Sequence, residues 1–402
     1  MFSHSDSTLD LAIVGGGIIG LSIAWRAAQR GLSVTVFERG ELGGGATHVA
    51  AGMLAPVSEV EFGEAGRGVL ELGMRSAAIW PEFAAELELA AEAEVGLRRG
   101  GTLVVARDDD EARELERQLA FRQELGLRAS RLRASEARER EPALAPTVRL
   151  ALHAPDDHSV DPRKVIAALS RACEREGVRL RRHTPVLGLE FDSAGVRVLG
   201  VRVERECERD QLSAEGSSVA RKAPLSDKAP PLDSHVGKAP LSCEVLPASE
   251  VVVAGGAWSG ALPGLPAGAG VNVRPVKGQI LRLRDPAGPG LLEGVVRFEG
   301  GYLVPRGDGR YVLGATVEER GFEPNATAGG VYELLRDAHE LVPGISELQI
   351  EELGVGYRPG TPDNVPIVGH GRLDGLLWAT GHHRNGILLA PLTAELLMEE
   401  LA

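Results

Sequence analysis

Three glycines and one acidic residue near the N-terminus have the spacing of a site that binds phosphate and ribose. Gly15, Gly17 and Gly20 follow the pattern G-x-G-x-x-G, and Glu38 comes 18 positions after Gly20. The first glycine permits a tight turn, the second lets the backbone approach a pyrophosphate, and the third lets a helix pack closely on a strand. A carboxylate at Glu38 can accept a hydrogen bond from a ribose hydroxyl and would repel a 2′-phosphate. The pattern therefore indicates NAD or FAD rather than NADP, without separating the two.

The segments around these residues have the composition of a βαβ unit. Residues 10–14 and 32–37 are short apolar runs, and residues 22–30 carry alanine and isoleucine at helical spacing. Gly31 is placed to end the helix. We predict strand, glycine turn, helix and strand, with the positive end of the helix dipole pointing at the phosphates. Because 51 of the 402 residues are glycine, the pattern alone is weak evidence, and a glycine turn in an unrelated α/β unit is the alternative.

Two further glycine-rich stretches are candidates for contact with a large cofactor. Residues 40–57 combine glycine and alanine with an apolar segment at 50–54, so the backbone can lie close to a bulky ligand. The alternative for this stretch is a flexible loop. Residues 376–379 form an apolar strand that leads into a glycine turn and a C-terminal helix. That turn is a second candidate cradle for a phosphate or a flavin.

The rest of the chain shows helical and strand patterns in turn. Helices are predicted over 66–93, with a break at Pro81, and over 108–126, where the acids and arginines form a solvated face. Asp161 is predicted to cap a further helix, and residues 302–304 and 311–315 to form a hairpin.

Composition limits the class of protein. With 402 residues and 43% hydrophobic residues, the chain can form two domains with sizeable cores. The net charge of −13 disfavours nucleic acid as a partner. We see neither a signal peptide nor a membrane span. The cysteines Cys173, Cys207 and Cys243 are scattered, so we expect free thiols, no metal site and a cytoplasmic location.

Residues 206–244 differ from the rest of the chain. The run KAPLS occurs twice, at 222–226 and 238–242, in a segment rich in proline, serine and lysine. This composition predicts a disordered insertion between two strands, and a docking site for a partner is the alternative.

Several motifs occur in an order that resembles the FAD-dependent amino-acid oxidases of the D-amino-acid oxidase superfamily. GGGIIG is followed by LGGGATHVAAGML, HTPV, VVVAGGAWSG and RPVKGQ, and then by YLVPR, GYRPGTPDNVPIVG and GHHRNGILLAP. Together they look like the glycine oxidases, which act in the thiamine pathway. The resemblance runs from about Leu9 to the C-terminus and is interrupted by the insertion.

The resemblance implies FAD as a non-covalent cofactor. In the related monomeric sarcosine oxidases a cysteine in the C-terminal half tethers the flavin, and here no cysteine follows Cys243. Residues 385–388 match a turn whose backbone N–H groups face the flavin ring, and Val186 matches a residue whose backbone meets the adenine. The implied cofactor-binding residues are Gly15, Gly17, Ile18, Ile19, Gly20, Glu38, Arg39, Thr47, Ala50, Ala51, Gly52, Met53, Leu54, Val186, Gly255, Trp258, His382, His383, Arg384, Asn385, Gly386, Ile387 and Leu388.

The resemblance also implies a set of substrate-binding residues. Tyr302 and Arg358 match the two side chains that hold the substrate carboxylate, and Arg384 matches a residue close to both flavin and substrate. The planar guanidinium of an arginine suits a carboxylate because it can bind both oxygens. An ordinary surface ion pair is the alternative for Arg358. Departures from the family pattern at three positions leave the pocket size open: Gly300, Val317 and His383.

The implied activity is oxidative deamination of glycine and other small amines. A hydride passes from Cα to the flavin N5, dioxygen is reduced to hydrogen peroxide, and the imine is hydrolysed to glyoxylate or used in thiazole synthesis. No catalytic acid or base is required, and none is assigned. The alternatives are a sarcosine oxidase, a D-amino-acid dehydrogenase and a non-catalytic flavin-binding protein.

The expected fold class is mixed α/β and α+β, with a Rossmann-type FAD-binding domain and a second domain built on an antiparallel sheet. We predict that 1–86, 151–265 and 340–402 form the FAD-binding domain, and that 87–150 and 266–339 form the substrate-binding domain. The expected partners are a small amino acid, dioxygen and a thiazole synthase that takes over the product. We expect no nucleic acid or membrane partner, and a homo-oligomer whose subunit number the sequence does not give.

Overall fold

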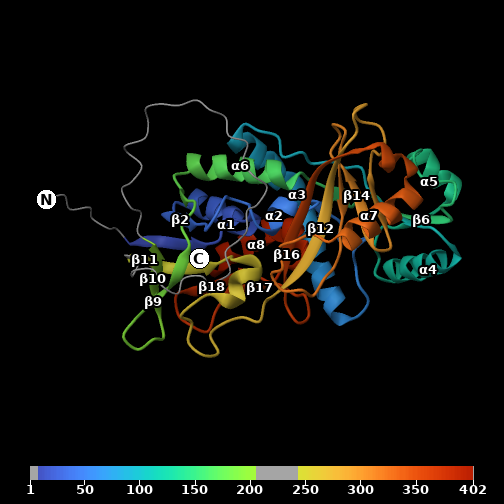
Figure 1. The fold of residues 1–402 in the computed structure, drawn as a ribbon. Coiled ribbons are helices and arrows are strands. Elements are labelled where there is room, and N and C mark those ends of the chain that lie inside the picture. Colours follow the sequence, from blue (N-terminus) through green and yellow to red (C-terminus); the bar gives the residue numbers. More distant parts are fainter. Residues whose placement is uncertain (1–7, 205–242, 402) are drawn as a thin grey trace, which may run out of the picture.

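The computed structural model describes residues 8–204 and 243–401. Two sheets lie beside each other in Figure 1, each with its own helices. The predicted insertion at 206–244 lies outside the described residues, apart from its last two positions, which begin a strand.

The first sheet has a parallel centre formed by the predicted βαβ unit. Its strand order is β17–β18–β11–β1–β2–β8, with β10 paired to β11 and β9 paired to β10. All neighbours from β18 to β8 along this order are parallel, and β17, β10 and β9 are added antiparallel. The strands are β1 (Leu9–Val14), β2 (Val34–Phe37), β8 (Arg179–Arg181), β9 (Val186–Phe191), β10 (Val198–Glu204), β11 (Cys243–Val253), β17 (Ile367–His370) and β18 (Leu376–Thr380).

Four helices form the largest apolar core with this sheet. They are α1 (Ile18–Gln29), α3 (Glu64–Ala91), α6 (Pro162–Arg175) and α8 (Gly386–Glu400). The predicted break at Pro81 is wrong, because α3 runs through it. A proline inside a helix costs about 3 kcal/mol. Its neighbours Trp80 and Phe83 are fully buried and contact each other edge to face, and burial of each is worth about 1.5–3 kcal/mol, which offsets that cost.

Two predicted helix ends, at Asp161 and Gly31, are confirmed. Asp161 caps α6, its side chain accepting a hydrogen bond from the backbone N–H of Arg163. Gly31 follows α1 with φ +82°, a conformation that favours glycine. Short elements link the large ones: α2 (Ala46–Val49), β3 (Met53–Leu54) paired with β7 (His158–Ser159), and the 3₁₀ helices η1 (Gly256–Ala261), η2 (Pro343–Glu347) and η3 (His383–Asn385).

The second sheet has the order β16–β12–β15–β14–β13–β4–β6–β5. Its neighbours are antiparallel except for β13 and β4. The predicted hairpin is confirmed as β14 and β15. The strands are β4 (Thr102–Ala106), β5 (Ser130–Arg133), β6 (Leu150–Ala154), β12 (Arg274–Arg284), β13 (Val295–Phe298), β14 (Gly301–Pro305), β15 (Arg310–Gly314) and β16 (Gln349–Gly360).

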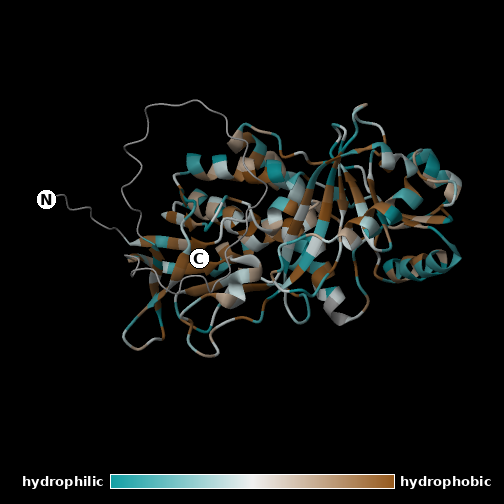
Figure 2. Ribbon diagram, viewed as in Figure 1, coloured by the Kyte–Doolittle hydropathy of each residue, from teal (hydrophilic) through white to brown (hydrophobic). Residues whose placement is uncertain are grey.

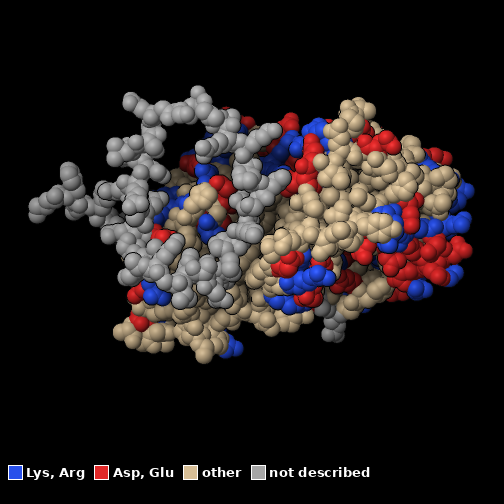
Figure 3. All heavy atoms as spheres, in the orientation of Figure 1, with Lys and Arg blue, Asp and Glu red and all other residues tan. Residues whose placement is uncertain are grey.

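Three helices accompany the second sheet. Residues of α5 (Ala134–Arg140) and α7 (Ala328–Leu341) pack with this sheet in one apolar cluster. The helix α4 (Asp109–Glu124) lies at the far end and is largely hydrophilic in Figure 2. Charged side chains of both signs cover this end in Figure 3, as predicted for residues 108–126. Arg122 is the exception, because it is only 2% exposed.

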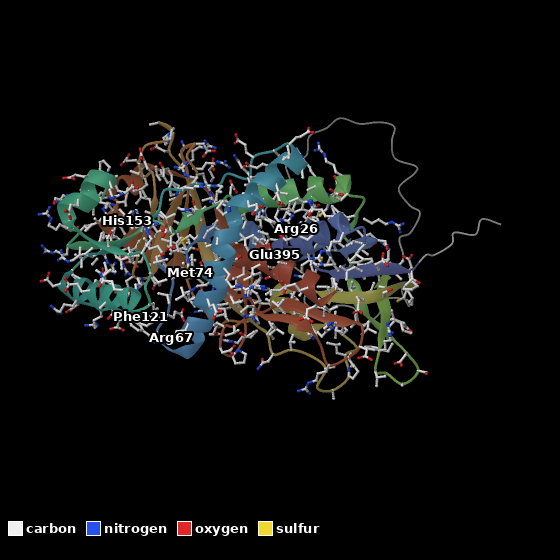
Figure 4. The ribbon with its side chains drawn as sticks, turned by 180° about the vertical axis from the view of Figure 1, so that it is seen from behind. Arg26, Arg67, Met74, Phe121, His153 and Glu395 are labelled. Atoms are coloured by element: carbon white, nitrogen blue, oxygen red, sulfur yellow. The ribbon has the colours of Figure 1, made fainter. Side chains whose placement is uncertain are left out.

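The helix α3 lies between the two halves. From behind, its Met74 stands between Arg26 and Glu395 of the first half and His153 and Phe121 of the second (Figure 4). The domain boundaries stay a prediction. Because β6 and β16 pair into the second sheet, we propose that their residues belong with the substrate-binding part. Within the described residues, no helix has the length and apolar character needed to cross a membrane.

Candidate active site

The turn between β1 and α1 contains two glycines that the fold requires and one that it does not. Gly15 has φ +111°, and a Cβ there would lie 2.4 Å from the Ala254 carbonyl oxygen. A Cβ on Gly20 would lie 2.0 Å from the Gly15 oxygen. A Cβ on Gly17 would meet only the Thr47 hydroxyl, at 3.5 Å, and Gly17 caps α1 without a side-chain hydrogen bond. The open space beside this helix end, for which Gly17 itself supplies no side-chain cap, fits the pyrophosphate of FAD.

Glu38 lies directly beside this turn. Its Oε2 accepts from the Gly16 N–H at 2.8 Å and its Oε1 from the Gly40 N–H at 2.9 Å. Each carboxylate oxygen keeps a second lone pair, so the side chain can still accept from a ribose hydroxyl. The Thr184 N–H donates to the Glu38 carbonyl oxygen at 2.8 Å, which brings the segment before Val186 to the same edge.

Two other predicted cofactor residues lie near this edge. The Arg39 guanidinium lies 3.7 Å above the centre of the Trp258 ring, in a cation–π contact. Trp258 belongs to η1, which follows Gly255 at the carboxyl end of β11. Ligands bind at the carboxyl ends of strands in open α/β sheets, which is where these residues are.

The stretch 47–54 runs from the first glycine turn to the second sheet. The Thr47 hydroxyl accepts from the Ile18 N–H at 3.3 Å. Gly52 has φ +77°, and a Cβ there would lie 2.0 Å from the Val160 oxygen. Ala51 and Met53 pack in one apolar cluster with Tyr302. The predicted cofactor stretch and the predicted substrate residue therefore share one apolar cluster.

The turn between β18 and α8 also approaches the second sheet. The backbone of His382 forms a β-bridge with Gly360, two residues beyond Arg358. The Leu388 carbonyl is fixed to α3, accepting from the Ser76 hydroxyl at 2.6 Å and from the Trp80 indole at 2.8 Å. The N-terminal end of α8 has no side-chain cap, so the first backbone N–H groups of this helix can face a ligand.

Tyr302 and Arg358 come together from β14 and β16. Burial raises the pKa of the Tyr302 hydroxyl, and the Arg358 guanidinium, within hydrogen-bonding reach, lowers it by a smaller amount. The Arg358 Nη1 donates to the Thr316 carbonyl at 3.1 Å. Among the described residues, no carboxylate lies within 4.0 Å of this guanidinium, whose hydrogen bonds go to backbone carbonyls. The pair can therefore offer one hydroxyl and one cation to a ligand carboxylate.

Two strand glycines make room for these side chains, and no sequence pattern indicated that role. A Cβ on Gly278 would lie 2.6 Å from the Arg358 Nη1, and a Cβ on Gly314 would lie 2.7 Å from the Tyr302 ring. Neither glycine has a positive φ, so space rather than backbone conformation explains them.

Arg384 points towards residues 57–61, called the acidic loop here because they include Glu59 and Glu61. Its guanidinium contacts the Glu61 carboxylate, donates to the Glu59 carbonyl at 3.3 Å and lies 3.9 Å from the Glu59 carboxylate. The Arg297 guanidinium lies 3.5 Å from the same carboxylate, and Arg297 is directly opposite Tyr302 in the sheet. The sequence motifs did not indicate Glu59 or Arg297, because their pairing spans distant segments.

The acidic loop is held by two buried charged side chains, Asp157 and Arg122. Asp157 accepts from the Val57 N–H at 3.0 Å and from the Ser58 N–H at 2.7 Å, and burial raises the pKa of Asp157 to about 6. Arg122 donates to the carbonyls of the same two residues, both at 2.9 Å. These hydrogen bonds explain why Arg122 is buried, although a solvated face is predicted for the charged residues of its helix.

The two histidines of the turn after β18 are poor bases near neutral pH. Burial lowers the pKa of His382 to about 4, and burial together with the charges of Arg358, Arg384 and Arg274 lowers the pKa of His383 to about 4. The His382 Nε2 lies 2.9 Å from the Thr393 hydroxyl. Both side chains therefore stay neutral near neutral pH.

We expect His382→Gln to reduce the loss of stability in acid. An unfolded histidine takes up a proton below about pH 6.5, whereas His382 does so near 4, so its contribution to stability is complete above 6.5 and is lost as the pH falls towards 4. Between pH 7 and 5 this contribution falls by about 2 kcal/mol. Urea unfolding at both pH values measures it. His370→Gln, at a half-exposed histidine, is the control, and equal pH dependence in wild type and His382→Gln contradicts the prediction.

Known proteins are similar to this chain in sequence and in fold. The profile of the DAO family, described as FAD dependent oxidoreductase, matches residues 10–400. A glycine oxidase of Geobacillus kaustophilus is 34% identical, over 97% of this chain and 92% of its own length. The bifunctional protein ThiO/ThiG of Synechocystis sp. is also 34% identical, over 98% of this chain, which spans 51% of that relative. The crystal structure of glycine oxidase from Geobacillus kaustophilus matches with a TM-score of 0.81 and 32% identity, over 98% of this chain and 94% of that one.

These matches agree with the glycine turn, the two sheets and the predicted fold class, which is confirmed. They also distinguish FAD from NAD, which the glycine pattern could not do. The chain therefore belongs to the DAO family of FAD-dependent oxidoreductases, and it is an FAD-dependent amino-acid oxidase of the glycine oxidase type.

Proposed function

We propose that the protein oxidises glycine and other small amines, such as sarcosine and D-alanine, to imines. The observation that carries this proposal is the pairing of Tyr302 with Arg358, which has no carboxylate partner among the described residues. An unpaired guanidinium beside a neutral hydroxyl is suited to one carboxylate. The relative from Geobacillus kaustophilus, named glycine oxidase, supports glycine as the substrate.

The residues of this chain have distinct tasks in the proposed reaction. FAD would be held by Gly17, Glu38 and the turn at 385–388, and when bound it would supply the two-electron oxidation of the substrate and the reaction with dioxygen. The Tyr302 hydroxyl donates a hydrogen bond to the substrate carboxylate. Arg358 binds the same carboxylate and so fixes the orientation of the substrate Cα in the site. The neutral histidines near the site cannot act as strong bases, in line with a reaction that uses a neutral amine. The imine is then hydrolysed by water to glyoxylate and ammonia.

Anaerobic mixing of the yellow protein with glycine, sarcosine, D-alanine and D-proline tests this function. Bleaching of the flavin absorbance by glycine supports it, and the order of the rates measures the size of the pocket. Readmitted air should restore the colour and release hydrogen peroxide. Slow recovery in air would instead favour a D-amino-acid dehydrogenase. If none of the four amines bleaches the flavin, the proposed substrate is wrong.

The flavin is expected to be non-covalent. Cys173 is buried in the first core, and Cys243 begins β11, at the end of the strand opposite to Gly255. Neither side chain is at the carboxyl ends of the strands, where the cofactor residues lie. Acid precipitation should therefore leave the yellow colour in solution, and a yellow pellet would contradict this expectation.

The place in thiamine biosynthesis rests on the bifunctional relatives. This chain spans about half the length of the Synechocystis relative, whose name joins ThiO with ThiG. We propose that the imine, or glyoxylate formed from it, passes to a thiazole synthase. Adding purified thiazole synthase and its other substrates to the turning-over oxidase should give thiazole only when glycine is present.

A further inference from the structure

We propose that Lys277 is a positioning residue for the substrate carboxylate: its buried ammonium fixes residues 316–325, and this segment supplies the carbonyl that orients Arg358. The inference deepens the proposed function, because it concerns the same site. Lys277 is on β12, next to β16, which carries Arg358 (Figure 1).

The ammonium of Lys277 is held entirely by one segment. Its side chain is 0% exposed. The Nζ atom contacts the Glu323 carboxylate, donates to the Asn325 carbonyl at 2.6 Å and lies 3.6 Å from the Glu318 carboxylate. All three partners are between β15 and α7. Removing one partner of a buried ion pair leaves an uncompensated charge, so this contact strongly favours one position of the segment.

The two carboxylates remain charged in this arrangement. The hydrogen bond from Lys277 lowers the pKa of Glu323. Burial acts to raise the pKa of Glu318, but hydrogen bonds from Thr316 and Gln279 and the charge of Lys277 lower it overall. Gln279 adds a second attachment, because its amide donates to Glu318 at 2.6 Å and to the Thr327 hydroxyl at 3.1 Å.

The same segment reaches Arg358 through the backbone. Lys277 and Glu318 exchange two backbone hydrogen bonds, each 2.9 Å long. Two residues earlier, the Thr316 carbonyl accepts from the Arg358 Nη1 at 3.1 Å, and the Lys277 carbonyl lies 3.5 Å from the same atom. The guanidinium lies over Gly278, which has no side chain to block it. A displaced segment therefore removes an acceptor that sets the direction of the guanidinium.

Lys277 acts through this segment rather than on the substrate. Successive side chains of a strand point to opposite faces, so Lys277 and Gln279 share one face and Gly278 lies on the other. The guanidinium of Arg358 is over Gly278, on the face away from the ammonium.

The segment has an anchor that does not involve Lys277. Phe322 stacks on Trp258 with ring centres 4.8 Å apart, and the Tyr357 hydroxyl donates to the Phe322 carbonyl at 3.2 Å. Loss of the lysine should therefore loosen the segment without unfolding it. This separates a positioning role from a general contribution to stability.

The test compares Lys277→Met with Lys164→Met in the FAD-loaded enzyme. Lys164 also pairs with a carboxylate, Glu94 at 3.7 Å, but is partly exposed and distant in sequence from the site. The measurements are kcat and KM for glycine, FAD content, and the Kd of acetate from the change in flavin absorbance. We expect Lys277→Met to raise KM and the acetate Kd about tenfold, with FAD content and kcat within about threefold of wild type. Unchanged acetate binding and KM would overturn the proposal.

A double-mutant cycle checks that the effect passes through Arg358. In an Arg358→Ala background, Lys277→Met should weaken acetate binding no further, and an additive effect would contradict the proposed route. If Lys277→Met does not fold, Glu323→Gln takes its place, with a smaller rise expected in the acetate Kd and no rise counting against the proposal. Acetate binding can be measured without turnover. If glycine does not bleach the flavin, the proposed function is wrong, but the effect of Lys277 on acetate binding can still be tested.

Discussion

Gly17→Ala should give a folded protein that no longer retains FAD at ordinary concentrations. A Cβ at this position meets only the Thr47 hydroxyl, at 3.5 Å, and the backbone has φ −76°, which any residue adopts. The protein itself therefore tolerates alanine. The added methyl group takes the space through which the pyrophosphate approaches the helix end, and losing those contacts costs about 2–3 kcal/mol, or about 100-fold in Kd.

Gly20→Ala is the matched control for this prediction. Its Cβ would lie 2.0 Å from the Gly15 carbonyl oxygen, so this substitution should destabilise the protein with or without FAD. FAD titration of the apoprotein and urea unfolding distinguish the two variants. Gly17→Ala should keep the unfolding midpoint of the wild-type apoprotein. Unaltered FAD affinity in Gly17→Ala would mean that the pyrophosphate does not approach this residue.

Local patterns predicted the parts of the fold that local interactions determine. The unit from β1 to β2 could be predicted because its glycines, apolar runs and closing acid all lie within about 30 residues. The helix cap at Asp161 was predicted for the same reason. The continuation of α3 through Pro81 could not be predicted, because the burial of Trp80 and Phe83 is a tertiary effect that the sequence pattern does not show.

The environment of the site depends on contacts between distant segments, and these could not be predicted. Glu59 meets Arg297 and Arg384 across more than 200 residues of sequence, and Asp157 fixes a loop 100 residues before it. Lys277 is the one residue of this environment that carries a signal in the sequence. It stands in the strand pattern RPVKGQILRLR, where a buried lysine needs acidic partners, but nothing in the pattern says which acids supply them.

Arg358→Ala should have the largest effect on substrate binding. This guanidinium is held by backbone carbonyls rather than by a carboxylate of the described chain, so its charge is available to the substrate. Charge-assisted hydrogen bonds are worth about 1.5–3 kcal/mol each, so we expect kcat/KM for glycine to fall by about 10²- to 10³-fold, mostly through KM. FAD should remain bound, because the cofactor residues belong to the first sheet and its turns.

Two further variants distinguish the loss of the planar guanidinium from a general loss of positive charge. Arg358→Lys keeps the charge but loses the planar fork, so its KM should lie between those of wild type and Arg358→Ala. Arg274→Ala removes a neighbouring arginine that already pairs with Glu319 at 3.2 Å and donates to the Thr361 carbonyl, and it should change KM little. Equal effects of Arg274→Ala and Arg358→Ala would indicate a general loss of positive charge. An unchanged KM in Arg358→Ala would show that the substrate carboxylate binds elsewhere, and the pairing of Tyr302 with Arg358 would then serve only to join β14 to β16.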